Sequence, residues 1–312
     1  MAKRPIDRIL TALGDLHLTE GLAALPGSDL TALLLDVMGR RVAGLSAADV
    51  MRQRASDRFV APGGVDLRTL HATEADLLAA LPDAFSTVVL SPLAPAGLHG
   101  TVAGVSQNNV VSTIRRTDVA ADPTTGLAIE AARRRVECLG SRPRSDELVR
   151  LASIQRVVRA QVFEGSMTFA HFSLLGIVTA GRDTGSRSFE VTALAEHSAT
   201  LARCLLAAGA DRLDVRITDW TDGKLGEVVA RLRPALAEGQ VNVVEHPERV
   251  RARGYYQHGA FEITATIGDL VFSAADGGLV DWTQKLVGSR KERLMISGIG
   301  IDRVAASRAQ AG

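Results

Sequence analysis

Residues 154–181, IQRVVRAQVFEGSMTFAHFSLLGIVTAG, carry the pattern that decides the fold class of this chain. Two runs rich in β-branched and aromatic residues, 154–163 and 169–181, flank a short segment that contains a glycine. Strand-like neighbours joined by a short glycine-containing segment are typical of a β-hairpin. This stretch therefore predicts two long antiparallel strands.

Further strand-like runs lie on both sides of this hairpin. They cover residues 86–95, 108–114, 117–122, 211–218 and 259–274. Helical periodicity covers 124–140 and 188–209, and each of these runs ends at a glycine, a common helix terminator. Because strands outnumber the helical crossovers and several neighbours are suited to hairpins, we expect an α+β fold with a mainly antiparallel sheet flanked by helices.

The N-terminal part of the chain is expected to be helical. Residues 28–42 and 46–59 show helical spacing, and each run starts with a serine that can cap it. A turn cluster, APGGVD at 61–66, separates them from the next helical segment. We therefore divide the chain into a helical N-terminal region, 1–72, and a core, 73–312.

Composition and charge argue against several classes of protein. The 312 residues are 46% hydrophobic and 23% charged, as in a soluble globular protein with a sizeable core. The net charge of +1, from 36 basic and 35 acidic residues, argues against strong electrostatic binding of nucleic acid. The basic run Arg133–Arg135 could form a local patch, but we interpret it as the solvated face of a helix.

Cysteine usage and the first residues indicate a reducing cytoplasm. Cys138 and Cys204 lie in unrelated settings, so we expect neither a disulfide framework nor a zinc site. The opening MAKRPIDRIL lacks the apolar core of a signal peptide, and no apolar run is long enough to span a bilayer. We therefore expect a cytoplasmic protein with no membrane partner and no protein-bound metal.

Arginines and tyrosines are the candidate ligand-binding residues. The sequence contains neither a phosphate-binding loop nor a Rossmann fingerprint in a strand–helix context. Guanidinium groups on an antiparallel sheet are another way to hold phosphates, and Arg159 and Arg303 suit that role. The only two tyrosines, Tyr255 and Tyr256, lie in RARGYYQHGAFE (251–262), which is either part of a substrate pocket or an edge strand with amphipathic side chains.

The order of these segments resembles the catalytic core of the class II aminoacyl-tRNA synthetases over about residues 74–305. Within that class the chain is most similar to histidyl-tRNA synthetase and its paralogue, the regulatory subunit of ATP phosphoribosyltransferase. ADLLAALPDAFSTVVLSPLAP, with Pro92, is similar to motif 1. RVVRAQ is similar to motif 2, with Arg159 at the motif's arginine and Gln161 in place of its glutamate. MISGIGIDRV is similar to motif 3, with Arg303 as its arginine.

The same resemblance implies residues that bind the substrate. VAADPTTGLAIEAA is similar to the segment that holds the amino group of the amino acid, so Asp122 and Thr124 are implied to bind the ammonium. RARGYY resembles the R-G-L-D-Y-Y motif of the histidyl enzymes. On that match Arg251 contacts the substrate carboxylate and α-phosphate, while Tyr255 and Tyr256 line the side-chain pocket.

For several of these residues the sequence leaves alternatives open. Asp122 could act only as the N-cap of a helix that starts at Pro123. Tyr255 and Tyr256 alternate along a strand, so one could pack while the other faces a pocket. His171 stands where the family has a substrate-contacting glutamine and is implied to bind substrate, yet it could be a hydrogen-bonded core histidine.

The resemblance implies ATP-dependent activation of an amino acid as an aminoacyl adenylate, with Mg²⁺ accompanying the nucleotide. The implied catalytic residues are Arg159 and Arg251, and the implied ATP-binding residues are Arg159, Gln161 and Arg303. The acceptor would be a small molecule, a carrier protein or tRNA. The alternative is a catalytically silent paralogue that binds an amino acid and regulates a partner enzyme.

Departures from the family pattern bear on that choice. The second arginine of motif 2 has no counterpart in FEGSMTF, Gln161 lacks the charge of the usual glutamate, and RARGYY lacks the aspartate before its tyrosines. Nine residues follow Arg303, so we expect no anticodon-binding domain and disfavour tRNA as a partner. Motif 1 builds a two-fold interface in the family, and we therefore expect a homodimer with contacts around Pro92.

Overall fold

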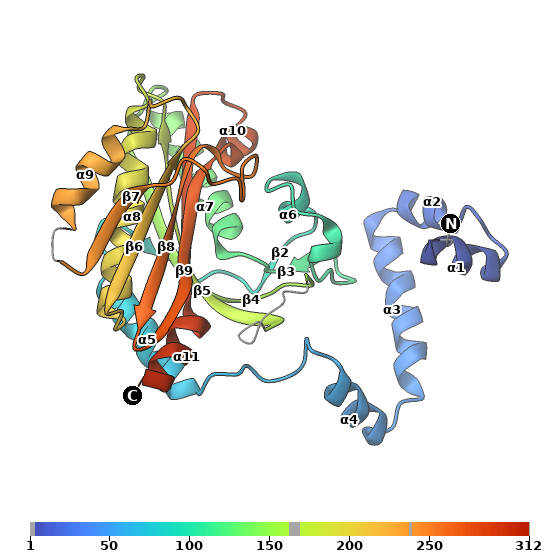
Figure 1. Cartoon of the computed structure of the whole chain (residues 1–312). Helices are drawn as coiled ribbons and strands as arrows, with labels where there is room; N and C mark the ends of the chain where they lie inside the picture. The colour runs from blue at the N-terminus through green and yellow to red at the C-terminus, as the bar shows by residue number, and fades with distance from the viewer. Residues whose placement is uncertain (1–3, 162–168, 237–238, 312) are drawn as a thin grey trace.

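A sheet of eight strands forms the centre of the protein in this computed structural model, which describes residues 4–161, 169–236 and 239–311 (Figure 1). All neighbouring strands are antiparallel except the outer pairs β1–β4 and β6–β7. The α+β fold class predicted from the sequence is confirmed. In sheet order the strands are β1 (Ser86–Thr87), β4 (Val149–Val158), β5 (His171–Arg182), β10 (Glu292–Gly300), β9 (Leu270–Val280), β8 (Gln257–Ile267), β6 (Arg212–Asp219) and β7 (Val241–Glu245).

Two hairpins, the first of them predicted from the sequence, provide most of the central sheet. β4 and β5 pair from Val149↔Ala180 to Val158↔His171, as the stretch 154–181 predicts. β8 and β9 pair up to Ile267↔Leu270, with Gly268 in the turn at a φ of 56°. A positive φ is what the tight two-residue hairpin turns require, and glycine adopts it without steric cost.

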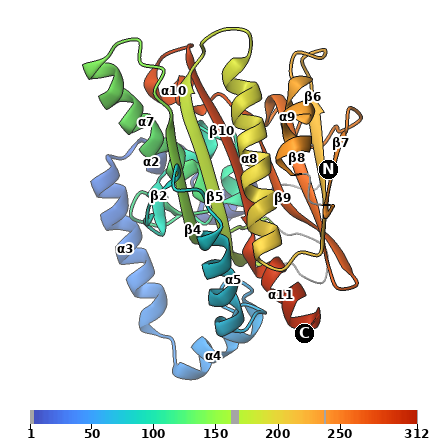
Figure 2. The same ribbon diagram turned by 90° about the vertical axis from the view of Figure 1, so that its left-hand side faces the viewer.

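Helices cover both faces of the sheet, and two glycines of β5 show which helix lies on which face (Figures 1 and 2). A Cβ at Gly176 would lie 2.8 Å from Pro123, the first residue of α7 (Pro123–Ser141). A Cβ at Gly181 would lie 3.0 Å from Phe189 of α8 (Ser188–Ala207). Because alternate residues of a strand point to opposite faces, even-numbered residues of β5 face α7 and odd-numbered residues face α8.

The remaining helices of the core follow this division. α10 (Trp282–Val287) packs against α7, while α5 (Leu67–Ala79) and α11 (Ile301–Ala311) pack against each other, α5 contacting α8 and α11 contacting β5. α9 (Glu227–Ala235) packs on α8 at the β7 edge. In the described part of the chain, no helix is long and apolar enough to cross a membrane.

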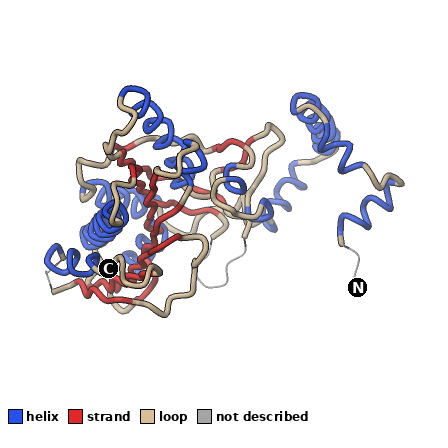
Figure 3. Tube along the Cα trace, turned by 90° about the horizontal axis from the view of Figure 1, so that it is seen from above, coloured by secondary structure: helices blue, strands red, loops and turns tan. Residues whose placement is uncertain are grey.

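The N-terminal helices stand away from the sheet (Figures 1 and 3). They are α1 (Pro5–Leu13), α2 (Leu18–Ala24), α3 (Gly27–Ala43) and α4 (Ala47–Ser56). Within these four helices Leu10 is the one buried residue. Ser46 caps α4 as predicted, through a capping box with Asp49. The expected division after residue 72 falls inside α5, which belongs to the core by its packing.

The predicted strand at 108–114 is wrong for most of its length. Residues Gln107–Asn109 form a short 3₁₀ helix, and Ser112 makes only an isolated bridge to Asp118. The buried Asp118 carboxylate accepts hydrogen bonds from the Gln107 side chain and the Gly97 amide, both at 3.0 Å, which holds the segment as a loop. A small separate sheet pairs β2 (Leu93–Pro95) with β3 (Thr117–Val119), beside the short helix α6 (Leu98–Thr101).

The basic run on α7 is only partly a solvated face. Arg133 and Arg134 pair with Glu130 at the surface, as expected. Arg135 is fully buried, and its guanidinium pairs with the equally buried Glu292 at 2.8 Å. Successive residues of a helix point about 100° apart, so the third arginine turns from solvent toward β10. The interpretation of a solvated face is therefore wrong for Arg135.

Candidate functional site

Asp122 lies at the N-terminus of α7, and from the sequence it could either cap this helix or bind a substrate ammonium. Its Oδ1 accepts hydrogen bonds from the Thr124 amide at 2.9 Å and the Thr124 hydroxyl at 2.7 Å. This is an N-cap, with Pro123 at the first helical position, where a missing N–H costs nothing. The other oxygen, Oδ2, lies 3.1 Å from Nη2 of Arg159. Capping therefore uses one oxygen and leaves the second for charged partners.

Arg159 follows β4 and lies directly beside this helix end. Its Nε donates to the Ala121 carbonyl at 2.9 Å, and its guanidinium carbon lies 5.1 Å from the centre of the Phe172 ring. The side chains of Arg159 and Asp122 are 29% and 28% exposed, so this ion pair is accessible to a ligand. A guanidinium carries five N–H donors, and among the residues that the structure describes only the Nε and Nη2 groups of Arg159 are engaged by oxygen acceptors.

The two tyrosines pack inward, side by side, against the α7 face of the sheet. Their rings meet edge to face at 5.0 Å, and Tyr255 meets Trp282 in the same way at 5.9 Å. Tyr256 lies against the backbone of Gly278, where a Cβ would come within 2.5 Å of the ring. Its hydroxyl donates to Oδ1 of Asp276 at 2.5 Å. The edge-strand alternative therefore does not describe these residues, since neither ring lies along an open edge.

The pKa values of the two phenols show that the charged groups surround them. Burial raises the pKa of Tyr255, the nearby Asp122 and Asp276 carboxylates raise that pKa further, and Arg159 lowers it. The pKa of Tyr256 is raised by burial and then by Asp276. Both hydroxyl groups therefore stay protonated at neutral pH and act as hydrogen-bond donors. Tyr255 therefore lies near all three charged groups, Asp122, Arg159 and Asp276.

Arg249 and Asp276 belong to this site and were missed by the reasoning from sequence. Nη2 of Arg249 lies 2.6 Å from Oδ2 of Asp276. The arginine side chain is 2% exposed and the aspartate side chain 41%, so the guanidinium lies beneath the carboxylate. Nη1 of Arg249 is buried without a hydrogen-bond partner among the described residues. One feature of the sequence could have indicated Asp276. It is a charged residue within a strand, and the two glycines after it allow an aromatic ring to approach the backbone.

His171 is not brought together with these residues. It is an odd-numbered residue of β5 and lies on the α8 face, opposite Asp122 and Tyr256. Its Nδ1 lies 2.9 Å from Nε of Arg156, and its Nε2 lies 2.6 Å from the carbonyl oxygen of Ala61. The first nitrogen therefore accepts and the second donates, and both are engaged by the protein.

The other implied residues lie near the ends of the central strands. Arg303, in the first turn of α11, donates to the Ser273 carbonyl at 2.9 Å. Gln161 is exposed and precedes residues 162–168, which lie outside the described residues together with most of FEGSMTF. Arg251 is exposed in the turn before the tyrosines, and its carbonyl accepts from Nε of Arg249 at 3.1 Å.

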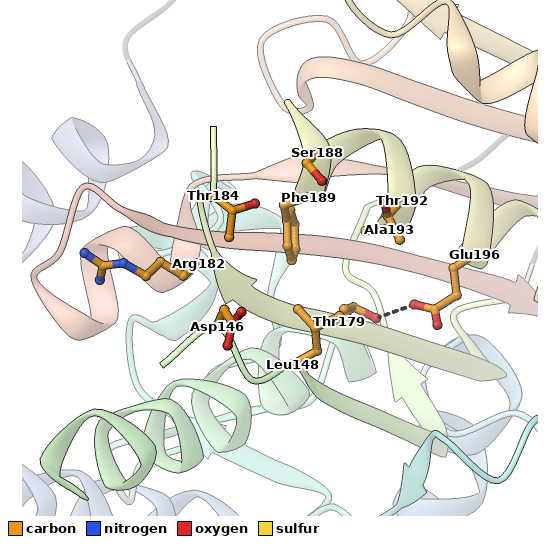
Figure 4. Close-up of a pocket in the computed structure, with 10 residues that line it drawn as sticks. All are labelled: Asp146, Leu148, Thr179, Arg182, Thr184, Ser188, Phe189, Thr192, Ala193 and Glu196. Carbon is orange, nitrogen blue, oxygen red and sulfur yellow. Dashed lines mark hydrogen bonds between the residues drawn. The ribbon is translucent and has the colours of Figure 1, made fainter. Parts of the chain in front are cut away.

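A separate cavity lies on the α8 face, between α8 and β5 (Figure 4). Its volume is about 160 Å³, and its lining includes Thr179 of β5, whose hydroxyl donates to Oε2 of Glu196 on α8 at 3.5 Å. Glu196 is also held by Arg150 at 2.8 Å. None of the residues implied by the resemblance lines this cavity.

Divalent metal ions find few ligands in the protein itself. Among the residues that the structure describes, no group of three or more histidine, cysteine or acidic side chains could hold a metal ion. Magnesium binds through few carboxylates when phosphate oxygens are present. The residues therefore fit Mg²⁺ only as an ion carried mainly by nucleotide phosphates.

Comparisons with known proteins identify the fold. No protein-family model matches the sequence, and no curated protein matches it. Among solved structures, an ATP phosphoribosyltransferase regulatory subunit/histidyl-tRNA synthetase from Bacillus halodurans superposes with a TM-score of 0.59 at 15% identity, over 79% of this chain and 82% of that one. Histidyl-tRNA synthetase from S. aureus gives 0.55 at 14% identity, over 77% of this chain and 64% of that one.

A third structure widens the comparison within the same fold. The pyrrolysyl-tRNA synthetase PylSc of Desulfitobacterium hafniense gives a TM-score of 0.51 at 15% identity, over 84% of this chain and 74% of that one. This chain spans less than two thirds of the S. aureus enzyme, 64%, and larger shares of the other two. The protein has a class II aminoacyl-tRNA synthetase-like fold, as the resemblance predicts.

Proposed function

We propose that the protein activates an amino acid with ATP, forming an aminoacyl adenylate that it passes to a small molecule, a carrier protein or tRNA. The observation that carries this proposal is the accessible Asp122–Arg159 pair at the start of α7, beside the buried tyrosines. One member of the pair suits an α-ammonium and the other suits a phosphate.

The substrate ammonium binds Oδ2 of Asp122 in this proposal and displaces the guanidinium of Arg159. A carboxylate is an acceptor-only, charged partner for an ammonium, and the released arginine turns its fork to the α-phosphate. A substrate carboxylate oxygen then forms a bond to the α-phosphorus, and pyrophosphate leaves with the bonding electron pair. Arg159 and Arg251 stabilise the negative charge that builds on the phosphoryl oxygens.

The nucleotide is held by further residues near the strand ends. Arg303 and Gln161 complete the ATP site with Arg159, and Mg²⁺ brought in with the nucleotide would supply charge neutralisation there. Thr124 orients the Asp122 carboxylate through its two hydrogen bonds. His171 has no part in this step, because both of its nitrogens are engaged on the other face of the sheet.

A second candidate function is a catalytically silent subunit that binds an amino acid and regulates a partner enzyme. Gln161, a neutral and exposed amide in place of a glutamate, favours it, because the ATP side of the site then lacks a charge that the family carries. The amino-acid side, built on Asp122 and the tyrosines, would serve either function equally.

Amino-acid-dependent exchange of pyrophosphate into ATP tests the proposal. A screen of the amino acids should find exchange with at least one of them, and Arg159→Ala should lower it at least tenfold. Arg133→Ala is the matched control, since Arg133 is an exposed arginine on α7 whose partners are surface glutamates. Binding of an amino acid without exchange by any member of the panel would instead establish the regulatory alternative.

We also propose that the protein works as a homodimer in the cytoplasm. The segment similar to motif 1 leaves Val89 fully exposed and Leu93 nearly half exposed, on either side of Pro92. Apolar side chains in such positions suit a two-fold interface that buries the same patch on both subunits. Light scattering should give twice the chain mass of 33.0 kDa, and a value of one chain mass at micromolar concentration contradicts the dimer.

A further inference from the structure

One row of paired residues crosses the α7 face from the helix end to Asp276. Gly176 of β5 pairs with Gly298 of β10, and Gly298 pairs with Asp276 of β9. Residues directly opposite each other on antiparallel strands project to the same face. Gly176 lies beneath Pro123 and Thr124, so the Asp276 side chain projects on the face where Asp122 caps α7.

The two carboxylates are separated along this row by two glycines. Pro123 and Thr124 cover Gly176, and Gly298 lies between Gly176 and Asp276. Neighbouring strands lie about 4.8 Å apart, so Gly176 and Asp276 are about 10 Å apart across two strand spacings. A ligand held by Asp122 at one end therefore meets Asp276 at the other only if it is long.

Asp276 is held in place without being closed off. Its Oδ1 accepts from Tyr256 and its Oδ2 from Arg249. An ionised carboxylate has about four acceptor positions, so further donors can bind. Because Arg249 is 2% exposed and Asp276 is 41% exposed, the open side of the carboxylate faces away from the arginine.

We propose that Asp276 selects the amino-acid side chain and that the substrate is a long basic amino acid, ending in an ammonium or a guanidinium. This inference rests on the proposed function, in which Asp122 holds the α-ammonium. The side chain then runs from the start of α7 past Gly298, and its terminal N–H donors bind the open oxygens of Asp276. The phenol of Tyr256 and the guanidinium of Arg249 fix the carboxylate for this contact.

Lysine and norleucine test the inference, because they have the same chain length and differ in the terminal charge. Calorimetry with each amino acid, together with the exchange assay, should show that lysine or arginine binds at least tenfold more tightly than norleucine or glutamate. Asp276→Asn should bring the ratio of lysine to norleucine close to one. Glu262→Gln is the matched control: Glu262 is paired with Asp276 on the next strand and has its own arginine partner, Arg216 at 3.3 Å, so the ratio should not change.

A second variant keeps the charge that Arg249 needs, in case Asp276→Asn fails to fold. Asp276→Glu extends the carboxylate by one methylene and should shift the preference from lysine toward ornithine, which is one methylene shorter. Two results overturn the inference while leaving the proposed function intact: norleucine or glutamate binds as tightly as lysine, or both Asp276 variants keep the wild-type preference. If no amino acid binds at all, the proposed function fails and this inference fails with it.

Discussion

Two arginine–carboxylate pairs lie along α7, and they differ in exposure. In the C-terminal half of the helix Arg135 and Glu292 are both 0% exposed, and the guanidinium also donates to the carbonyls of Ser145 and Glu147. At the N-terminal end Asp122 and Arg159 are each more than a quarter exposed. The same two chemical groups thus occur once in the interior and once at an accessible surface.

That difference separates a structural role from a binding role. The buried pair has all three guanidinium nitrogens engaged and little capacity for a ligand, and removal of one partner leaves a charge in the interior. A partly exposed pair contributes little to stability, because water screens it and competes for it. Its members can therefore exchange partners when a ligand arrives. The Arg249–Asp276 pair combines both situations, with a buried guanidinium beneath an exposed carboxylate.

The largest effect is expected at the buried end. Arg135→Ala leaves Glu292 uncompensated in the interior, so the free energy of unfolding should fall by about 3–5 kcal/mol in a denaturant titration. Arg133→Ala, two residues away, breaks surface pairs and should change it by at most about 1 kcal/mol. Equal losses for the two variants would contradict the distinction drawn between the pairs.

A smaller effect, on binding rather than stability, is expected at the accessible end. Asp122→Asn keeps an N-cap, since asparagine caps helices as well as aspartate, but removes the charge. Charge-assisted hydrogen bonds contribute about 1.5–3 kcal/mol, so amino-acid affinity measured by calorimetry should fall about tenfold or more. Asp122→Ala should lose the cap as well, at about 1 kcal/mol of unfolding free energy. Unchanged affinity in Asp122→Asn would leave the residue with a capping role only.

The α8 face of the sheet contains a third kind of buried polar group, an uncharged histidine held by two hydroxyl groups. His197 is buried between Ser297 at 2.8 Å and Thr179 at 2.9 Å, and burial lowers its pKa from 6.5 to about 3. Between these two values the unfolded chain binds a proton that the folded protein does not bind. The stability is therefore complete above pH 6.5 and falls as the pH drops toward 3, by at most about 1.4 kcal/mol per pH unit.

Unfolding of the wild type and of His197→Gln at pH 7 and pH 5 checks this prediction. The variant lacks the titrating ring, so its unfolding free energy should change less between the two pH values. Equal pH dependence in the two proteins would show that His197 is not kept neutral by the fold.

The sequence predicted the β4–β5 hairpin because local chemistry dictates it: the predicted runs 154–163 and 169–181 overlap the observed strands Val149–Val158 and His171–Arg182. Gly209 follows the end of α8 as predicted, whereas Gly140 lies inside α7. The predicted run 259–274 is divided into β8 and β9 by the turn at Gly268. Asp122 and Arg159 were found only through the resemblance, and the structure adds that they pair with each other.

The features that could not be predicted from the sequence are the face of a strand on which a residue lies and the contacts between residues far apart in the chain. His171 and Phe172 are neighbours, yet a step of one residue along β5 places the histidine on the opposite face from Arg159. Arg249 and Asp276 are 27 residues apart and meet only because the turn before β8 folds back over β9. Similarly, the burial of Arg135 depends on Glu292, at the start of a strand far along the chain.

Calorimetric titration with ATP separates the two pairs, because the accessible pair is proposed to bind phosphate and the buried pair is not. We expect a clear heat of ATP binding for the wild type and for Arg133→Ala, and at least tenfold weaker binding for Arg159→Ala. A wild-type protein that gives no heat with ATP, or an Arg159→Ala variant that binds ATP as tightly as the wild type, would contradict this expectation.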